Sequence, residues 1–268
     1  MTYGNCDNPI GVFDSGLGGL TVVRELRRIL PFENIIYFGD TARVPYGSKS
    51  KKKIIEFSIE NVKFLLLHNV KIIVVACNTS TAAALDEIQK IANVPVVGVI
   101  TPGVKYAVSK TFNKKVGVIG TLGTINSEAY TKHILDINGN IHIYSQPCPL
   151  FVPLVEEGWI DKHITELVIS EYLSPLKIAG IDTLILGCTH YPLIKNKISD
   201  FFDNQINIVD SAESCSIAVK EKMEYEKLLN NKTDNRGIAT FFVSDTPAKF
   251  SEIGSRFLGE EFTAIKVV

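Results

Sequence analysis

Cys77 stands where an apolar run gives way to small polar residues, a position that can activate a thiol. The run Ile-Ile-Val-Val-Ala precedes it, and Asn78, Thr79 and a small-residue segment of helical character follow it. A thiol at the start of a helix feels the helix's positive end, so we expect its pKa to be lowered. Asn78 and Thr79 can donate hydrogen bonds to a carboxylate. A small buried cysteine that merely ends a strand would show the same pattern.

Cys188 repeats this arrangement later in the chain, with a histidine close behind it. The run Thr-Leu-Ile-Leu-Gly precedes it, and Thr189 and His190 follow. An imidazole can take or hold the thiol proton, or polarise a substrate, because its ordinary pKa lies near neutrality. A single Cys-x-His pair offers too few ligands for a tetrahedral metal site, so we expect no metal.

Residues 14–19, Asp-Ser-Gly-Leu-Gly-Gly, form a third polar segment after an apolar run. The glycines permit close backbone approach, and the helical pattern over residues 20–30 places a helix N-terminus there. The Asp14 carboxylate repels a phosphate but pairs with an ammonium group, which favours a small zwitterion over a nucleotide. The segment also suits a plain helix entry in which Asp14 and Ser15 cap backbone amides.

Two thiols indicate chemistry on the two faces of one carbon. One thiol can remove a proton from one face while the other delivers a proton to the opposite face, which inverts a stereocentre. The α-proton of an amino acid is far less acidic than a thiol, so such a site must exclude water and hold the α-carboxylate with preorganised donors. A hydrolase using Cys188 as nucleophile and His190 as base would leave Cys77 without a role.

Short apolar runs alternate with longer segments of helical periodicity, which predicts an α/β fold around a mainly parallel sheet. Strands are predicted over residues 10–13, 35–38, 72–76, 96–99, 116–119, 141–144, 183–187, 206–209 and 238–243. Each of the three polar segments directly follows a predicted strand. Because open α/β sheets bind ligands at the carboxyl ends of their strands, one cleft can collect all three.

The two halves of the chain resemble each other weakly. Residues 10–15 are similar to 116–121, and residues 34–38 to 140–144, at the same offset. The runs that lead into the two cysteines have nearly that offset too. A duplication would produce two similar domains that face each other, each contributing one cysteine.

Two further helices are predicted from their patterns. The segment from Ser50 to Leu67 suits an amphipathic helix with its lysines in water. In the tail, a helix over residues 247–258 with Asp245 as its N-cap follows the last predicted strand. We expect this tail to return to the first domain.

Composition and charge narrow the function classes. The chain has 268 residues, 28 basic and 29 acidic, and a net charge of −1, which argues against a broad nucleic-acid or membrane surface. No apolar run is long enough to cross a membrane and the N-terminus lacks a secretory pattern, so we expect a cytoplasmic protein. Five cysteines without CxxC spacing predict free thiols, of which Cys6, Cys148 and Cys215 are expected to be non-catalytic.

Nearly the whole chain closely resembles the cofactor-independent glutamate racemases of the aspartate/glutamate racemase superfamily. Five segments carry the resemblance in the right order: residues 10–22, 37–47, 76–82, 151–158 and 187–193. The resemblance implies two pseudo-symmetric parallel-sheet α/β domains facing each other across the active site. The first would comprise residues 1–98 plus 210–268, and the second residues 99–209.

The resemblance also implies catalytic roles at matching positions. Cys77 would be the base toward D-glutamate and Cys188 the base toward L-glutamate, each serving as the acid in the other direction. Asp14 and His190 are the implied assisting groups beside the two thiols. Glu156 resembles a further acidic residue that supports His190.

Substrate contacts are implied in the same way. Small polar side chains would hold the α-ammonium and α-carboxylate groups: Ser15, Asn78, Thr79, Thr121 and Thr189. Tyr46 and Gly47 match the loop that receives the distal carboxylate, through backbone amides, and Asp14 and His190 are also implied to contact substrate. Aspartate racemases usually show Gly-Cys-Thr-Glu, whereas this chain has Gly-Cys-Thr-His, so His190 favours glutamate.

The implied function is a cytoplasmic glutamate racemase, an isomerase without metal or cofactor, that supplies D-glutamate for peptidoglycan, cell-wall biogenesis and cell shape. A homodimer is implied, and binding to DNA gyrase is known for some members. Only about nine residues precede the first predicted strand, so we expect no activation by a peptidoglycan precursor. Two alternatives stay open: a racemase for aspartate or another amino acid, and a non-catalytic amino-acid-binding regulatory module.

Overall fold

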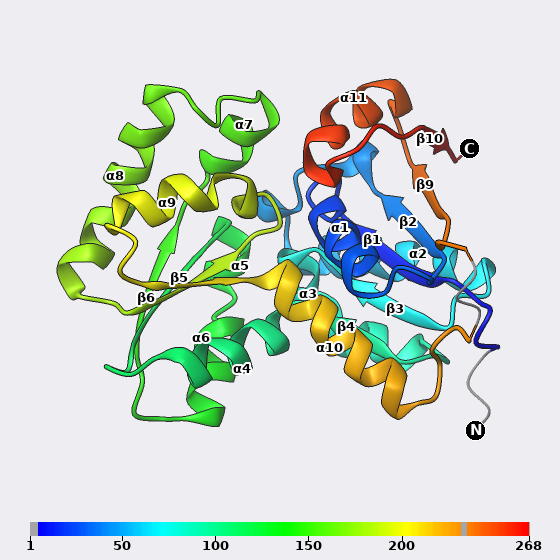
Figure 1. Ribbon diagram of the computed structural model, residues 1–268, viewed down its shortest axis with the longest axis horizontal. Helices are drawn as coiled ribbons and strands as arrows, with labels where there is room; N and C mark the ends of the chain where they lie inside the picture. The colour runs from blue at the N-terminus through cyan, green and yellow to red at the C-terminus, as the bar shows by residue number, and fades with distance from the viewer. Residues whose placement is uncertain (1–4, 232–234, 268) are drawn as a thin grey trace.

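The chain folds into two halves, each built around a parallel sheet. The computed structural model describes residues 5–231 and 235–267. Figure 1 shows the halves side by side, with the first strand, β1, and the last strand, β10, in the same half. The predicted α/β fold with two parallel sheets is therefore confirmed.

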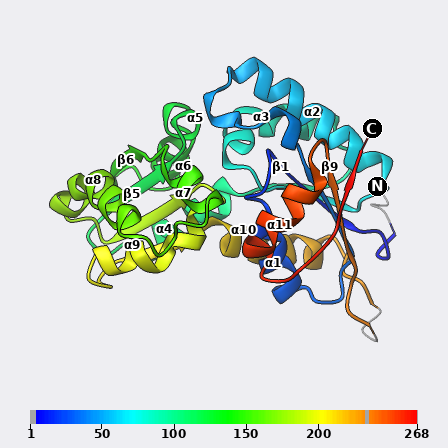
Figure 2. The ribbon, with the colours of Figure 1, turned by 90° about the horizontal axis from the view of Figure 1, so that it is seen from above.

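Sheet A has the strand order β10-β9-β2-β1-β3-β4, and all its neighbours pair in parallel. Its strands are β1 (Ile10–Asp14), β2 (Ile35–Gly39), β3 (Ile72–Val75), β4 (Val96–Gly98), β9 (Ala239–Val243) and β10 (Ala264–Lys266). The residues of β1 and β3 are all buried because helices cover both faces of the sheet. In Figure 2, α2 (Lys51–Leu67) and α3 (Asn78–Ile91) lie on one side, and α1 (Leu20–Ile29), α10 (Ser211–Tyr225) and α11 (Pro247–Leu258) on the other.

Sheet B has the order β6-β5-β7-β8, also parallel throughout. Its strands are β5 (Lys115–Gly120), β6 (His142–Pro147), β7 (Thr183–Gly187) and β8 (Asn207–Asp210). The helices of this half are α4 (Ile100–Lys110), α5 (Leu122–Asn126), α6 (Ala129–Ile137), α7 (Phe151–Glu156), α8 (His163–Ala179) and α9 (Lys195–Phe201). Three short 3₁₀ turns complete the described elements: η1 (Thr41–Arg43), η2 (Tyr46–Ser48) and η3 (Tyr191–Ile194).

The two sheets share one strand order, which confirms the predicted internal similarity. In sheet A, β2-β1-β3-β4 repeats the order β6-β5-β7-β8 of sheet B. The segments aligned from sequence fall on β1 and β5 and on β2 and β6. Cys77 and Cys188 follow β3 and β7, which are equivalent strands. The two thiols therefore occupy matching places in the two halves.

The tail returns to the first half as predicted, because β9 pairs with β2 and β10 extends the same edge. The predicted helix over residues 247–258 is confirmed, but its predicted N-cap is wrong. Thr246, in the left-handed region at φ 46°, occupies the cap position, and Asp245 instead pairs with Lys266 Nζ at 2.7 Å. The short edge strand β10 was not predicted.

The predicted helix from Ser50 to Leu67 is also confirmed. The Ser50 hydroxyl caps it by accepting from the backbone N–H of Lys53, and Ile54, Val62 and Leu65 are buried against the core. Among the described residues, no helix combines the length and apolar character needed to cross a bilayer.

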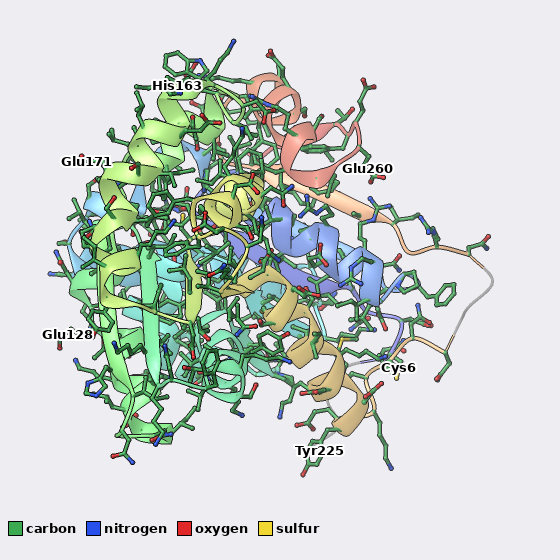
Figure 3. The ribbon with its side chains drawn as sticks, turned by 60° about the vertical axis from the view of Figure 1, so that its left-hand side comes forward. Cys6, Glu128, His163, Glu171, Tyr225 and Glu260 are labelled. Atoms are coloured by element: carbon green, nitrogen blue, oxygen red, sulfur yellow. The ribbon has the colours of Figure 1, made fainter. Side chains whose placement is uncertain are left out.

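The strands of sheet A come from residues 10–98 and 239–266, and those of sheet B from residues 115–210. Between the last strand of sheet B and the tail, α10 runs under sheet A and ends at the exposed Tyr225 (Figure 3). The domain limits at residues 98 and 210 stay predictions.

Candidate active site

A cavity of about 370 Å³ lies where the two halves meet. All but one of the predicted site residues line it: Ser15, Tyr46, Gly47, Cys77, Asn78, Thr79, Thr121, Glu156, Cys188, Thr189 and His190. Asp14 is the exception. A larger hollow of about 650 Å³ between α3, α4 and α10 contains no cysteine or histidine among its described lining residues. The thiol chemistry is therefore concentrated in the smaller cavity.

Cys77 joins β3 to α3 and forms the N-cap of that helix. Its Sγ accepts from the backbone N–H of Ser80 at 3.4 Å and lies 3.7 Å from the Ser15 hydroxyl. Burial and, to a smaller extent, the nearby charge of Asp14 raise the pKa of the Cys77 thiol to about 11, and the bonds to Ser80 and Ser15 only partly oppose this rise. The lowered pKa expected from the helix N-terminus is therefore wrong, because burial outweighs it.

Asp14 ends β1 and lies behind the cavity wall that Ser15 and Gly16 form. It is 1% exposed, and its Oδ2 accepts from the backbone N–H of Gly16 at 2.9 Å. Its Oδ1 has no hydrogen-bond partner among the described residues. Burial raises the pKa of this carboxyl. The charge of Asp14 therefore acts on Cys77, but Asp14 does not line the cavity. The predicted direct contact between Asp14 and the substrate's ammonium group is not supported by this position.

Cys188 follows β7 and stands next to an imidazole. Its Sγ lies 3.9 Å from His190 Nδ1, and His190 Nε2 lies 2.9 Å from Glu156 Oε1. Burial lowers the pKa of His190, but the hydrogen bonds and charges of Cys188 and Glu156 raise it by more, to about 10. The predicted grouping of these three residues is present, and it favours a proton on the imidazole beside the thiol.

The tail supports this grouping from the opposite half, which sequence reasoning missed. Arg256 Nη2 donates to the backbone oxygen of Glu156 at 2.7 Å, and the Phe257 ring packs edge-on against His190 with centroids 5.1 Å apart. Both residues lie on α11. The amphipathic pattern of α11 predicts its helix but not the surface it covers.

Three threonine hydroxyls join the halves at another side of the cavity. Thr79 lies on α3, and Thr121 and Thr124 lie at the start of α5; their Oγ1 atoms are 3.1 to 3.2 Å apart. Thr121 caps α5 by accepting from the backbone N–H of Thr124. Thr124 was not predicted, although its place one turn after Thr121 on a short helix is the signal that would find it.

The segments that follow β1 and β7 approach each other closely. The Thr21 hydroxyl donates to the backbone oxygens of Gly18, at 2.8 Å, and Thr189, at 3.0 Å. A Cβ at Gly18 would stand 2.0 Å from Thr189 Oγ1 and 2.6 Å from His190 Nδ1. This glycine is needed because only a bare backbone lets the two halves meet here.

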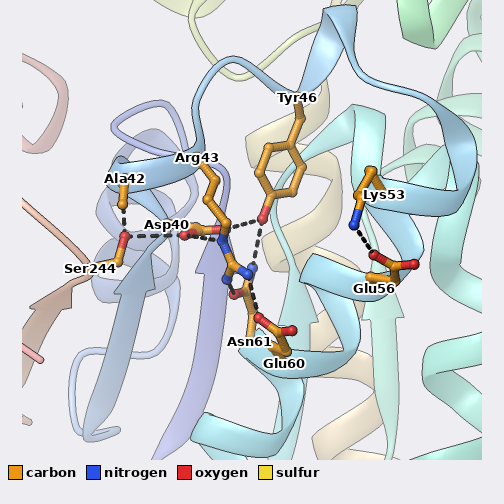
Figure 4. A network of polar contacts seen from close by, with 9 residues as sticks. All are labelled: Asp40, Ala42, Arg43, Tyr46, Lys53, Glu56, Glu60, Asn61 and Ser244. Atoms are coloured by element: carbon orange, nitrogen blue, oxygen red, sulfur yellow. Dashed lines mark hydrogen bonds and ion pairs between the residues drawn. The ribbon is translucent and has the colours of Figure 1, made fainter. Parts of the chain in front are cut away.

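A buried carboxylate holds the loop that carries Tyr46 and Gly47 (Figure 4). Both oxygens of Asp40 accept from Arg43 Nε, at 2.9 and 2.7 Å, and Asp40 also accepts from the hydroxyls of Tyr46 and Ser244. Burial and the Asp40 charge raise the pKa of Tyr46 well above its usual range, so its hydroxyl stays a donor. Asp40 was not predicted as a site residue, and it fixes the loop from outside the cavity.

Gly47 packs against the second half. A Cβ there would stand 3.0 Å from Thr121 Cβ, which is tighter than an ordinary contact. Tyr46 and Gly47 both line the cavity, and the contact of their backbone amides with the distal carboxylate stays a prediction.

The three cysteines expected to be non-catalytic lie outside the cavity lining. Cys6 is at the periphery (Figure 3) and donates to the backbone oxygen of Lys227 at 3.3 Å. Cys148 and Cys215 are buried, and burial raises the pKa of Cys215 to about 12.

No group of three or more His, Cys, Asp or Glu side chains is arranged to hold a metal ion in the described part of the chain. The predicted lack of a metal and of a cofactor stays a prediction.

Comparison with known proteins finds similar racemases along nearly the whole chain. The family model for Asp/Glu/hydantoin racemases matches residues 10–217. A glutamate racemase from Geobacter metallireducens is 50% identical over 250 residues, which cover 93% of this chain and 92% of that protein. The crystal structure of a Francisella tularensis glutamate racemase in complex with D-glutamate is 46% identical, covers 98% of both chains and has a TM-score of 0.92. A glutamate racemase isoform from Bacillus anthracis is 38% identical, again over 98% of both chains, with a TM-score of 0.94.

Proposed function

The chain belongs to the Asp/Glu/hydantoin racemase family, and on that premise we propose that it interconverts L- and D-glutamate with Cys77 and Cys188 as its two acid–base groups. The observation that carries the proposal is the placement of the thiols. Both are buried, both follow equivalent strands of the four-strand order that the two sheets share, and both line one cavity. Two opposed thiols suit proton removal on one face of the α-carbon and proton delivery on the other.

On the side of the second half, Cys188 acts as the base when its proton has moved to His190. Glu156 holds the far nitrogen of the imidazole, so an imidazolium is stabilised next to a thiolate. The thiolate then takes the α-proton of L-glutamate. Cys77, whose raised pKa keeps it a thiol, delivers its proton to the other face and yields D-glutamate.

In the reverse direction Cys77 must be a thiolate, the state that it reaches when it delivers its proton to the α-carbon and Cys188 holds the proton taken from L-glutamate. The Asp14 charge disfavours the Cys77 thiolate, and the substrate's ammonium group brings a compensating positive charge into the cavity. Cys188 then serves as the acid. The same two groups thus serve both directions with exchanged roles.

The substrate's own charges match the remaining cavity wall. The hydroxyls of Ser15, Thr79, Thr121 and Thr189 and the amide of Asn78 offer donors and acceptors to the α-carboxylate and α-ammonium groups. The backbone at Tyr46 and Gly47 offers amides to the distal carboxylate. Donors fixed in advance stabilise the negative charge that develops as the α-proton leaves.

The proposal is tested by proton NMR of L-glutamate with purified, pyridoxal-free protein in D₂O, together with a chiral assay. We expect the α-proton signal to disappear while D-glutamate appears, and aspartate to stay unchanged. Exchange with aspartate but not glutamate would refute the substrate assignment. Binding of glutamate without any exchange would favour an amino-acid-binding regulatory module instead.

The biological setting is part of the proposal. Supply of D-glutamate for peptidoglycan follows from the activity, and a cytoplasmic location from the need to meet intracellular glutamate. We also propose a homodimer, by analogy with the family. Light scattering during size-exclusion chromatography should give twice the chain mass, and a monomer mass at micromolar concentration would refute it.

A further inference from the structure

Tyr130 joins the two halves at the back of the cavity, where sequence reasoning placed no functional residue. It lies on α6 of the second half, is 2% exposed and does not line the cavity. Its hydroxyl donates to Oδ1 of Asn78, the first residue of α3 in the other half, at 2.6 Å. Figure 1 shows α3 and α6 in different halves. The bond exists only while the halves are together.

This bond leaves the other end of the Asn78 amide free. Asn78 lines the cavity and is 3% exposed, and its Nδ2 has no hydrogen-bond partner among the described residues. A buried N–H donor without a partner is costly, so such groups are usually paired. A carboxylate in the cavity would supply the missing acceptor.

The phenol also decides which way the amide faces. With Oδ1 toward Tyr130, the hydroxyl hydrogen has an acceptor and both N–H groups stay available. A flipped amide would leave the buried phenolic hydrogen without an acceptor in the described part of the chain, because the bond to Asn78 is the hydroxyl's only one there. Burial and the neighbouring Cys188 raise the pKa of Tyr130 above its usual range, so the hydroxyl keeps its proton.

A glycine makes room for this tyrosine. A Cβ at Gly187 would stand 3.0 Å from Tyr130 Cε2 and 2.6 Å from the backbone oxygen of Ile119. Gly187 directly precedes Cys188. Tyr130 therefore packs against the strand end that carries one thiol and bonds the residue next to the other.

We propose that Tyr130 is a positioning residue that fixes the Asn78 amide across the interface, so that its free N–H donor meets the α-carboxylate only when both thiols are in place. The inference rests on the proposed racemase function. The hydrogen bond from Tyr130 to Asn78 would then couple the assembly of the cavity to the orientation of the substrate.

The test is a double-variant cycle on glutamate racemisation. Tyr130→Phe removes the hydroxyl and keeps the ring, and Asn78→Ala removes its acceptor. We expect Tyr130→Phe to lower kcat/KM about tenfold in the native background but less than about twofold in the Asn78→Ala background. Equal losses in both backgrounds, or no loss in the native one, would overturn the proposal.

Tyr191→Phe is the matched control. Tyr191 is equally buried in the same half, and its hydroxyl donates to the backbone oxygen of Cys148 at 2.9 Å, not to Asn78. We expect it to keep kcat/KM within about twofold while lowering thermal stability about as much as Tyr130→Phe. A tenfold activity loss in this control would show that any buried hydroxyl matters equally and would overturn the specific role of Tyr130.

A direct measurement covers the case in which Tyr130→Phe does not fold. In the native protein, the Nδ2 protons of Asn78, assigned by their absence in Asn78→Ala, should shift on addition of D-glutamate. Unchanged resonances at saturation would overturn the proposal. An active native enzyme with unshifted Asn78 protons refutes only the Tyr130 inference, whereas a native protein that exchanges no α-proton refutes the racemase function with it.

Discussion

The two halves place different side chains at matching strand ends. Where the first strand of each repeat ends, the first half has Asp14 and Ser15, whereas the second has Gly120 and Thr121. After the second strand, one half has the loop of Tyr46 and Gly47, and the other has the segment that leads to Glu156. After the third strand, each half has a thiol.

The thiols match in position and differ in electrostatics. Cys77 lies near the negative charge of Asp14, and Cys188 lies beside an imidazole that Glu156 stabilises as a cation. A duplicated fold thus supplies two acid–base groups on opposite faces, and divergence after the strands tunes each one separately. Because the two enantiomers have equal free energy, kcat/KM must be the same in both directions. The electrostatic difference between the two thiols can therefore appear only in kcat and KM separately, or in exchange experiments.

Replacing either thiol should have the largest effect. We expect Cys77→Ser and Cys188→Ser each to lower racemisation by about 10²- to 10⁴-fold, because a serine hydroxyl is a much weaker acid. In D₂O, Cys77→Ser should still exchange the α-proton of L-glutamate without inversion, and Cys188→Ser that of D-glutamate. Proton NMR with a chiral assay measures both. Full activity in Cys77→Ser would instead indicate a single nucleophilic cysteine.

Glu156→Gln should remove the charge that stabilises the imidazolium of His190 beside Cys188. The pKa of His190 is raised to about 10, so activity that needs the imidazolium is present below that pH and is lost as the pH rises through it. Without the Glu156 charge the pKa falls, so the alkaline limb of kcat/KM should move to lower pH, with about a tenfold loss of rate near neutrality. The exposed neighbour Glu157 provides the control Glu157→Gln, which should leave the pH profile unchanged. An unmoved alkaline limb in Glu156→Gln would contradict the assignment.

Asp40→Asn should weaken the loop that only the first half contributes. Loss of one buried acceptor for Arg43 and Tyr46 costs about 1–3 kcal/mol, so we expect KM for glutamate to rise about five- to tenfold. Tyr46 packs in one small cluster with Cys77, but the loop supplies neither acid–base group, so kcat should change less than about threefold. Steady-state kinetics separate the two. Glu56→Gln breaks the exposed pair with Lys53 in the same view (Figure 4) and should change neither. A fall in kcat at constant KM would argue against a role in binding.

Cys148→Ala and Cys215→Ala should have the smallest effect on the reaction. Both thiols are buried outside the cavity lining, so racemisation should stay within about twofold of the native rate. A small packing defect of about 1 kcal/mol should lower Tm by about 2–4 °C, which calorimetry would detect. Loss of activity comparable to that of Cys188→Ser would mean that the second half uses more than one thiol.

The parts of the fold that local pattern determines were predictable. Buried strands and the helices after them produce clear periodicities, so both thiols could be placed at strand ends, and the repeat could be found by comparing the halves. The edge strand β10 spans only Ala264–Lys266, too short for a periodic signal. The cap at Thr246 depends on a backbone conformation that the Asp-Thr-Pro sequence does not specify.

Contacts between distant segments were not predictable from one sequence. Tyr130 and Asn78 are 52 residues apart, and Arg256 and Glu156 are 100 apart, and neither pair has a local pattern. The resemblance supplied Glu156 but not the helix that holds it. The raised pKa of Cys77 was not predicted either, because the burial of this thiol depends on the packing of both halves and not only on the helix that follows it.

The return of the tail to sheet A sets an order of assembly during synthesis. Domains tend to fold as units while the chain emerges from the ribosome. Sheet B is encoded without interruption between residues 115 and 210, whereas sheet A must wait for β9, and Glu156 and His190 must wait for α11. The half that is translated first is therefore finished last. Nascent chains arrested before Ala239 lack both β9 and α11, so they should protect sheet B from a protease while leaving sheet A cleavable. Such chains would contain both thiols but not the helix that supports His190.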